Sequence, residues 1–86
     1  EILADELTEL GISATELARQ IKVPANRISK ILSGKRSIAA DTALRLGRWF
    51  GTGPEIWLNL QQAYDLDVAA LGMGSDLDII EPRNAA

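Results

Sequence analysis

Positive charge is concentrated in one short stretch of this sequence. The segment KVPANRISKILSGKR, residues 22–36, holds five Lys or Arg residues and no acid, whereas the rest of the chain holds four basic residues and all twelve acids. The net charge is −5 over residues 1–18, +7 over residues 19–48 and −5 over residues 49–86, which gives −3 for the whole chain. A charged face is often only a solvated surface, but a concentrated basic block on an acidic chain indicates a nucleic-acid partner.

Side chains inside the basic block have the chemistry to read DNA. Asn26 can pair with adenine through two hydrogen bonds, and Lys30 can donate to the acceptors of guanine. Arg27 lies on the flank of the same segment and is expected to meet phosphate, and the amides and two cations of residues 33–36 suit phosphates too. The predicted DNA-contacting residues are Ser13, Ala25, Asn26, Arg27, Ser29, Lys30, Ser33, Lys35 and Arg36. Arg45 and Arg48 are expected to be plain surface residues.

The composition argues against catalysis and metal binding. The chain has no Cys and no His, which leaves a carboxylate-only metal or acid/base site as the alternative. Its carboxylates are scattered, so we expect no enzyme, no metal and no cofactor. Its 86 residues make one domain with a small core. No apolar run approaches the roughly 20 residues of a membrane span. The absence of Cys fits a cytoplasmic protein, and because the chain begins at Glu1 without Met we expect an upstream segment.

Five helices are expected to position the basic block, in an all-α fold. Apolar residues recur at spacings of three and four, and Gly and Pro punctuate them. Ser13 and Glu16 form a predicted capping box, in which each side chain bonds the backbone amide of the other residue. The expected helix boundaries are Gly11, Ser13, Pro24, Gly34, Asp41, Gly51, Pro54, and Gly72 with Gly74. Residues 1–71 would form the DNA-binding and dimerisation domain, and residues 72–86 a C-terminal tail that is loose or contains a short edge strand at LDII.

The second and third expected helices satisfy the demands of a helix-turn-helix motif. Ala18 is small where the helices cross, Val23 is the apolar residue of the turn, and Ile28 anchors the second helix. Leu17, Ile21 and Ile31 complete the buried set. Lys22 departs from the pattern, because the first turn residue is usually Gly with positive φ, and a non-Gly residue there costs on the order of 1 kcal/mol. The motif is nevertheless favoured over an ordinary helical hairpin.

The fifth expected helix has more large apolar residues than a small monomer needs. Trp57 is expected to close the core of the monomer, and Leu60 and Tyr64 are candidates for the same role. Leu66, Val68 and Leu71 lie further along, where exposure would leave an apolar patch. A two-fold dimer would bury this patch and set two recognition helices about one DNA turn, roughly 34 Å, apart. We therefore predict a homodimer interface at Leu66, Val68 and Leu71.

Most of residues 2–70 resembles the HigA-type antitoxins, a branch of the Cro/repressor-like helix-turn-helix proteins. The distinctive strings are RIS, GKR, ADTALRL, FGT and above all PEIWLNLQ. Lys22, Ala39, Gly47 and Gly53 depart from the pattern of the family, and these departures concern stability more than chemistry. The resemblance implies a homodimer that binds a palindromic operator in its own promoter and neutralises a HigB-type toxin, a small mRNA endonuclease.

Three functions remain open at this point: an antitoxin and autorepressor, a solitary transcriptional regulator of the same fold, or an interaction module that does not bind DNA. Salt-dependent DNA binding separates the third from the others, and a neighbouring reading frame for a small basic protein separates the first from the second. A toxin that grips mRNA must be positively charged, so the acids at the two ends of the chain are candidates for binding it. These acids are Asp5, Glu6, Glu9, Asp65 and Asp67, and keeping the protein soluble is the alternative role for them.

Overall fold

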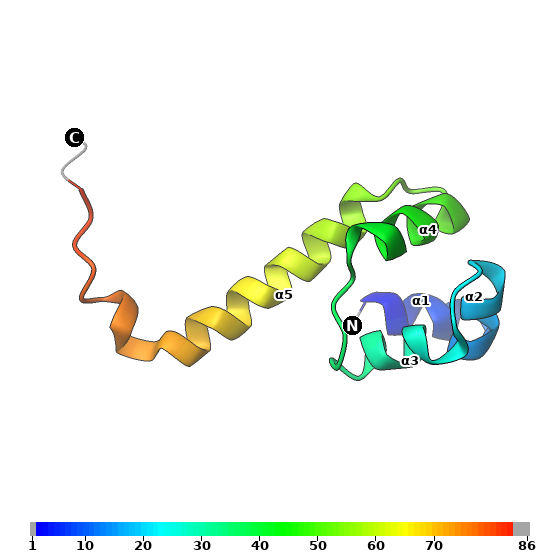
Figure 1. The fold of residues 1–86 in the computed structure, drawn as a ribbon, viewed down its shortest axis with the longest axis horizontal. Helices are drawn as coiled ribbons and strands as arrows, with labels where there is room; N and C mark the ends of the chain where they lie inside the picture. Colours follow the sequence, from blue (N-terminus) through cyan, green and yellow to red (C-terminus); the bar gives the residue numbers. More distant parts are fainter. Residues whose placement is uncertain (1, 84–86) are drawn as a thin grey trace.

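The computed structural model of the chain describes residues 2–83 and is entirely helical over them (Figure 1). Its elements are α1 (Ile2–Leu10), α2 (Ala14–Gln20), α3 (Ala25–Leu32), α4 (Ala40–Phe50), α5 (Glu55–Met73) and a short 3-10 helix, η1 (Gly74–Leu77). The prediction of five helices in an all-α fold is confirmed. None of the helices described in residues 2–83 is long and apolar enough to cross a membrane.

Helices α1 to α4 gather into a compact body, and α5 starts against α4 and projects away from it as a rod (Figure 1). The described chain is therefore elongated, with extents of 50 × 24 × 22 Å. Side chains from α1 to α4, together with Ile21 and Ile38 from the connecting segments, fill the core, and Trp57 is the one buried residue of α5. The buried apolar residues are Leu3, Leu7, Leu17, Ala18, Ile21, Ile28, Ile31, Ile38, Ala43, Leu46 and Trp57.

The N-terminus of α2 has half of the predicted capping box. The Ser13 hydroxyl oxygen accepts a hydrogen bond of 3.0 Å from the Glu16 amide, as expected. The prediction of the reciprocal bond, from the Ser13 amide to the Glu16 side chain, is wrong. The Glu16 carboxylate instead accepts hydrogen bonds from the side chains of Arg19 and Gln20. A charged guanidinium is a stronger partner for a carboxylate than a neutral backbone amide.

A close backbone contact fixes the corner between α4 and α5. The Gly47 carbonyl accepts hydrogen bonds from the amides of Gly51, Thr52 and Gly53 at 2.9, 3.1 and 3.2 Å. A Cβ atom at residue 47 would lie 2.3 Å from the Gly53 carbonyl carbon. Glycine inside α4 is therefore required by packing, which explains one departure from the family pattern.

The C-terminal part of the chain agrees with one expectation and differs from another. Of the two glycines expected to break the fifth helix, Gly74 ends α5 with positive φ. Gly72 lies inside the helix, because one glycine inside a helix costs only about 1 kcal/mol. Residues 77–80 do not form a strand; the amides of Asp78 and Ile80 donate to the carbonyls of Ser75 and Leu77 in consecutive turns. The division at residues 71 and 72 stays a prediction, and residues 84–86 of the predicted tail lie outside the described residues.

Candidate nucleic-acid interface

The turn between α2 and α3 has the predicted helix-turn-helix geometry. Lys22 is the only non-glycine residue with positive φ among residues 2–83, at 65°. The Val23 amide donates to the Ala18 carbonyl at 3.0 Å, and Pro24 then opens α3. Ala18 and Ile28 are fully buried where the two helices pack, and α2 and α3 form the most extensive helix pair of the body. The predicted conformation of Lys22 is confirmed.

The outer face of α3 carries the side chains expected to read bases. Ile28 and Ile31 are buried, and Ala25, Asn26, Ser29 and Lys30 are exposed on the opposite side. The Ser29 hydroxyl donates 3.1 Å to the Asn26 carbonyl of its own helix. This face therefore presents an amide at Asn26 and, one turn later, a hydroxyl and an ammonium group at Ser29 and Lys30.

The loop after α3 uses its backbone differently from the expectation. The Gly34 amide donates to the Ile31 carbonyl at 3.1 Å, and the Lys35 amide donates to the Lys30 carbonyl at 2.9 Å. With Gly34 at φ 78°, these two bonds form a Schellman cap for α3. The amides of Gly34 and Lys35 are thus occupied, so the expectation that they would receive phosphate is wrong.

Side chains of the same loop remain exposed. Ser33, Lys35 and Arg36 are all at the surface, and the Ser33 hydroxyl donates to the Lys30 carbonyl at 3.1 Å. The Ile38 amide donates to Gln61 Oε1 at 2.8 Å, which ties the loop to α5. Two cations close to the C-terminus of α3 can still contact phosphates, and sequence reasoning missed the part that Gln61 plays in anchoring this loop.

Ser13 is exposed at the start of α2, where its oxygen caps the helix. A hydroxyl that accepts one hydrogen bond keeps its own proton for donation. Ser13 can therefore cap α2 and donate to a phosphate at the same time.

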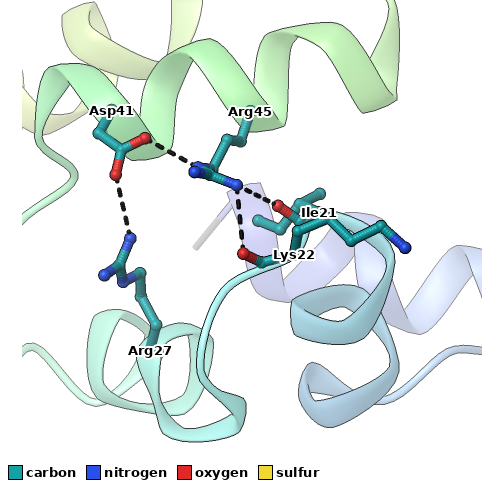
Figure 2. A network of polar contacts seen from close by, with 5 residues as sticks. All are labelled: Ile21, Lys22, Arg27, Asp41 and Arg45. Carbon is teal, nitrogen blue, oxygen red and sulfur yellow. Dashed lines mark hydrogen bonds and ion pairs between the residues drawn. The ribbon is translucent and has the colours of Figure 1, made fainter.

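Two arginines and one aspartate link the recognition helix to α4 (Figure 2). Arg27 Nη1 lies 3.3 Å from Asp41 Oδ2, and Arg45 Nε lies 2.8 Å from Asp41 Oδ1. Arg45 Nη1 also donates to the carbonyls of Ile21 and Lys22, at 2.8 and 3.2 Å. The hydrogen bond from Arg45, and to a smaller extent Arg27, holds the pKa of Asp41 below its ordinary value.

This arrangement corrects the expectation for Arg45, which is not a plain surface residue. Asp41 and Arg45 are four residues apart on one helix, so their pair could be foreseen from the sequence. The bonds from Arg45 to the turn could not, because they join residues 23 and 24 positions apart. Arg48, one turn further along, is exposed as expected.

Arg27 is more enclosed than its predicted role suggested. Its side chain is only 18% exposed, and its Nε is buried without a hydrogen-bond partner among residues 2–83. Its Nη1 is paired with Asp41, which leaves Nη2 for an external anion.

Residues 2–83 contain no group of three His, Cys, Asp or Glu residues that could hold a metal.

Comparisons with known proteins agree with this geometry. A family profile described as helix-turn-helix matches residues 3–57. Virulence-associated protein I of Dichelobacter nodosus is 50% identical over 70 residues, which cover 80% of this chain and 65% of that protein. The chain thus spans just under two thirds of the length of this relative.

Solved structures cover more of the chain. An addiction module antidote protein of a HigA family from Coxiella burnetii is 50% identical and superposes with a TM-score of 0.91, covering 96% of this chain and 92% of that one. The Pseudomonas aeruginosa antitoxin HigA, solved with the higBA promoter, is 45% identical with a TM-score of 0.88, covering 95% and 91%.

Proposed function

This chain belongs to the helix-turn-helix family and, within it, to the HigA antitoxins, and we propose that it binds the operator of its own promoter and neutralises a HigB-type toxin. The family consists of DNA-binding regulators and not of enzymes. The observation that carries the proposal is the exposed polar face of α3, in a fold that a 45% identical relative uses in a structure with promoter DNA.

The proposed DNA contacts divide by chemistry. Ala25, Asn26, Ser29 and Lys30 would meet base edges in the major groove, because α3 presents them away from the core. Phosphates would be contacted by the exposed Ser13, Ser33, Lys35 and Arg36, and by Nη2 of Arg27.

Titration of duplex DNA at several salt concentrations tests this assignment. Lys35→Ala should weaken binding to every duplex and reduce the slope of log K against log salt by about 0.9, since one phosphate contact is lost. Asn26→Ala should instead cost about 1–3 kcal/mol on the operator alone. Arg83→Ala removes the same charge from the exposed C-terminal tail and is the control.

An unchanged salt slope in Lys35→Ala would show that the loop after α3 does not lie on the DNA backbone. Absence of salt-dependent DNA binding by the wild-type protein would favour the interaction module. A neighbouring reading frame for a small basic protein supports the antitoxin role over a solitary regulator.

We further infer that two copies pair through the distal half of α5. Leu66, Val68 and Leu71 are 66%, 52% and 85% exposed. Pairing about a two-fold axis would remove this apolar surface from water and give two recognition helices a common spacing of about 34 Å, one DNA turn.

The proposed toxin surface is acidic. Asp5 and Glu9 are exposed and four residues apart on α1, while Asp65 and Asp67 are exposed on α5. Asp5→Lys combined with Glu9→Lys should slow association with a HigB-type toxin and make it less sensitive to salt, because electrostatic steering is lost. Asp76→Lys with Asp78→Lys applies the same charge change to the C-terminal segment as a control. Unchanged kinetics in the first pair would direct the search to Asp65 and Asp67.

A further inference from the structure

We propose that Arg45 is a positioning residue for DNA recognition, one that sets the discrimination between operator and other DNA without touching either. This inference rests on the proposed function, since it concerns how α3 is held when it reads DNA. The side chain of Arg45 joins α4 to the turn of the helix-turn-helix motif and, through Asp41, to α3 itself (Figure 2).

The first half of the link holds the turn. Arg45 Nη1 donates to the carbonyls of Ile21 and Lys22, which follow the end of α2. Carbonyls at the end of a helix lack partners within it, and a cation there also suits the helix dipole. These two carbonyls lie on either side of the Cα atom of Lys22, whose φ is 65°. Arg45 therefore fixes the backbone at the one strained non-glycine position described in residues 2–83.

The second half holds the recognition helix. Asp41 accepts from Arg45 with one oxygen and from Arg27 with the other, at 2.8 and 3.3 Å. Arg27 directly follows Asn26, and its mostly buried side chain runs from α3 towards α4. Helix α3 has only eight residues, and Ile28 and Ile31 are its only buried ones. The bridge through Asp41 therefore adds a polar constraint next to Asn26, in addition to the packing of α3 on α2.

Specific and non-specific binding should respond differently to the loss of this constraint. Contacts to phosphates tolerate small rotations, because they depend mainly on charge. Bidentate hydrogen bonds to base edges require side chains placed to within about half an ångström. A loosened α3 should therefore keep its non-specific affinity and lose part of its specific affinity.

The test compares Arg45→Ala with Arg48→Ala, a substitution with the same charge change at an exposed position three residues along α4. Dissociation constants are measured for the operator duplex and for a duplex of scrambled sequence at several salt concentrations. Arg45→Ala should weaken operator binding by about tenfold, comparable to one bidentate base contact, and leave the scrambled duplex within about twofold. Its salt slope should stay that of the wild type, and Arg45→Lys, which keeps one donor group, should recover part of the loss.

Two results would overturn the inference. A parallel loss on both duplexes with a salt slope reduced by about one unit would make Arg45 a phosphate contact. A lower melting temperature with an unchanged ratio of the two affinities would make its role purely structural. If Arg45→Ala does not fold, Asp41→Asn and Arg45→Lys are compared in the same assay, and an unchanged ratio in both would again overturn it.

Failure of the proposed function gives a different result. Wild-type protein that binds neither duplex in a salt-dependent way contradicts DNA binding as such. Wild-type protein that prefers its operator, together with an Arg45→Ala variant that keeps the same preference, contradicts only the role of Arg45.

Discussion

Exposure of apolar side chains differs between two regions of the molecule. We call residues 2–57 the body and residues 66–80 the distal arm. All eleven buried apolar residues lie in the body, which ends at Trp57. The distal arm exposes seven large apolar side chains, from 39% for Met73 to 85% for Leu71. This many exposed large apolar side chains in one segment favour an interaction site there. The body therefore has a complete core as a single copy, and the distal arm does not.

Charge follows the same division. The body contains every basic residue of the chain except Arg83, whereas the distal arm contains Asp67, Asp76 and Asp78 and no Lys or Arg. An acidic arm is unsuited to the DNA backbone. The basic block thus lies in the body, where the proposed DNA contacts are, and the distal arm has only acidic charge.

The largest expected contrast concerns side-chain truncation. Trp57 is 2% exposed, its ring centroid lies 4.9 Å from that of Phe50, and its Nε1 donates to Thr52 Oγ1 at 3.1 Å. Trp57→Ala should lower the free energy of unfolding by about 3–5 kcal/mol in urea denaturation. Leu71→Ala should change it by less than about 0.5 kcal/mol at protein concentrations where the chain is monomeric. Equal losses would mean that the distal arm packs on the body.

Association should show the reverse contrast. Val68→Asp places a charge in the proposed dimer interface and should weaken self-association by about 2–4 kcal/mol, as for a central interface residue. Sedimentation at micromolar concentration measures the self-association, and titration with operator DNA should show reduced binding. Leu44→Asp is the control, because Leu44 is 60% exposed but lies on the body. Monomeric wild-type protein in the same experiment would refute the proposed interface.

One glycine in each region extends the comparison to the backbone. Gly47→Ala should destabilise the protein by about 1–3 kcal/mol, because its Cβ would overlap the backbone of Gly53. Gly72→Ala should stabilise α5 by about 0.5–1 kcal/mol, since nothing lies within 4 Å of the added atom and alanine favours a helix. Thermal unfolding of both variants measures the two signs, and a loss in Gly72→Ala would place a neighbour against α5 there.

The sequence predicted the parts of the fold that depend on local spacing. The helix-turn-helix positions Ala18, Val23 and Ile28, and the conformation of Lys22, follow from a fixed pattern over eleven residues. The role of Arg45 did not follow, because its partners in the turn are 23 and 24 residues away and are backbone atoms. Periodicity does not encode such contacts.

The same limit applied to the end of α5 and to the role of Tyr64. A break at Gly72 and Gly74 was inferred from glycine alone. Gly74 ends α5, but at Gly72 the surrounding helix outweighed the low helix propensity of glycine. Tyr64 was a candidate for the core and is 56% exposed, because α5 projects away from the body beyond Leu60, which packs against the core, and Gln61, which binds the Ile38 amide. The direction of a helix relative to the body depends on packing at its first turns, which no spacing rule describes.

A smaller effect is expected within the body, at the turn. Lys22→Gly should raise the free energy of unfolding by a few tenths to about 1 kcal/mol, because glycine adopts φ 65° without strain. The greater conformational entropy of glycine in the unfolded chain offsets part of this gain. The bond from Arg45 should survive, as it reaches the backbone carbonyl of residue 22. Lys22→Ala removes the same charge but keeps the Cβ, so it should show no gain. A clear drop in melting temperature for Lys22→Gly would mean that the lysine side chain itself stabilises the turn.

The smallest expected effect concerns the ion pairs, all three of which, among residues 2–83, lie in the body. The hydrogen bond from Arg19, followed by that from Gln20, lowers the pKa of Glu16 to about 2 from 4.5. Because the folded-state pKa is the lower one, the pair stabilises the fold at and above pH 4.5, and this contribution is lost as the pH falls from about 4.5 to about 2. The effect is small because the pair is exposed to solvent.

Glu16→Gln should remove this pH-dependent contribution, so its melting temperature should fall less steeply than that of the wild type between pH 4.5 and pH 2. Arg19→Ala removes the largest cause of the shift and should flatten the same part of the curve. The double variant should then resemble either single variant, because both act on one interaction. Additive effects of the two substitutions would contradict this prediction. They would show that Glu16 and Arg19 affect the stability of the fold separately, and not through their ion pair.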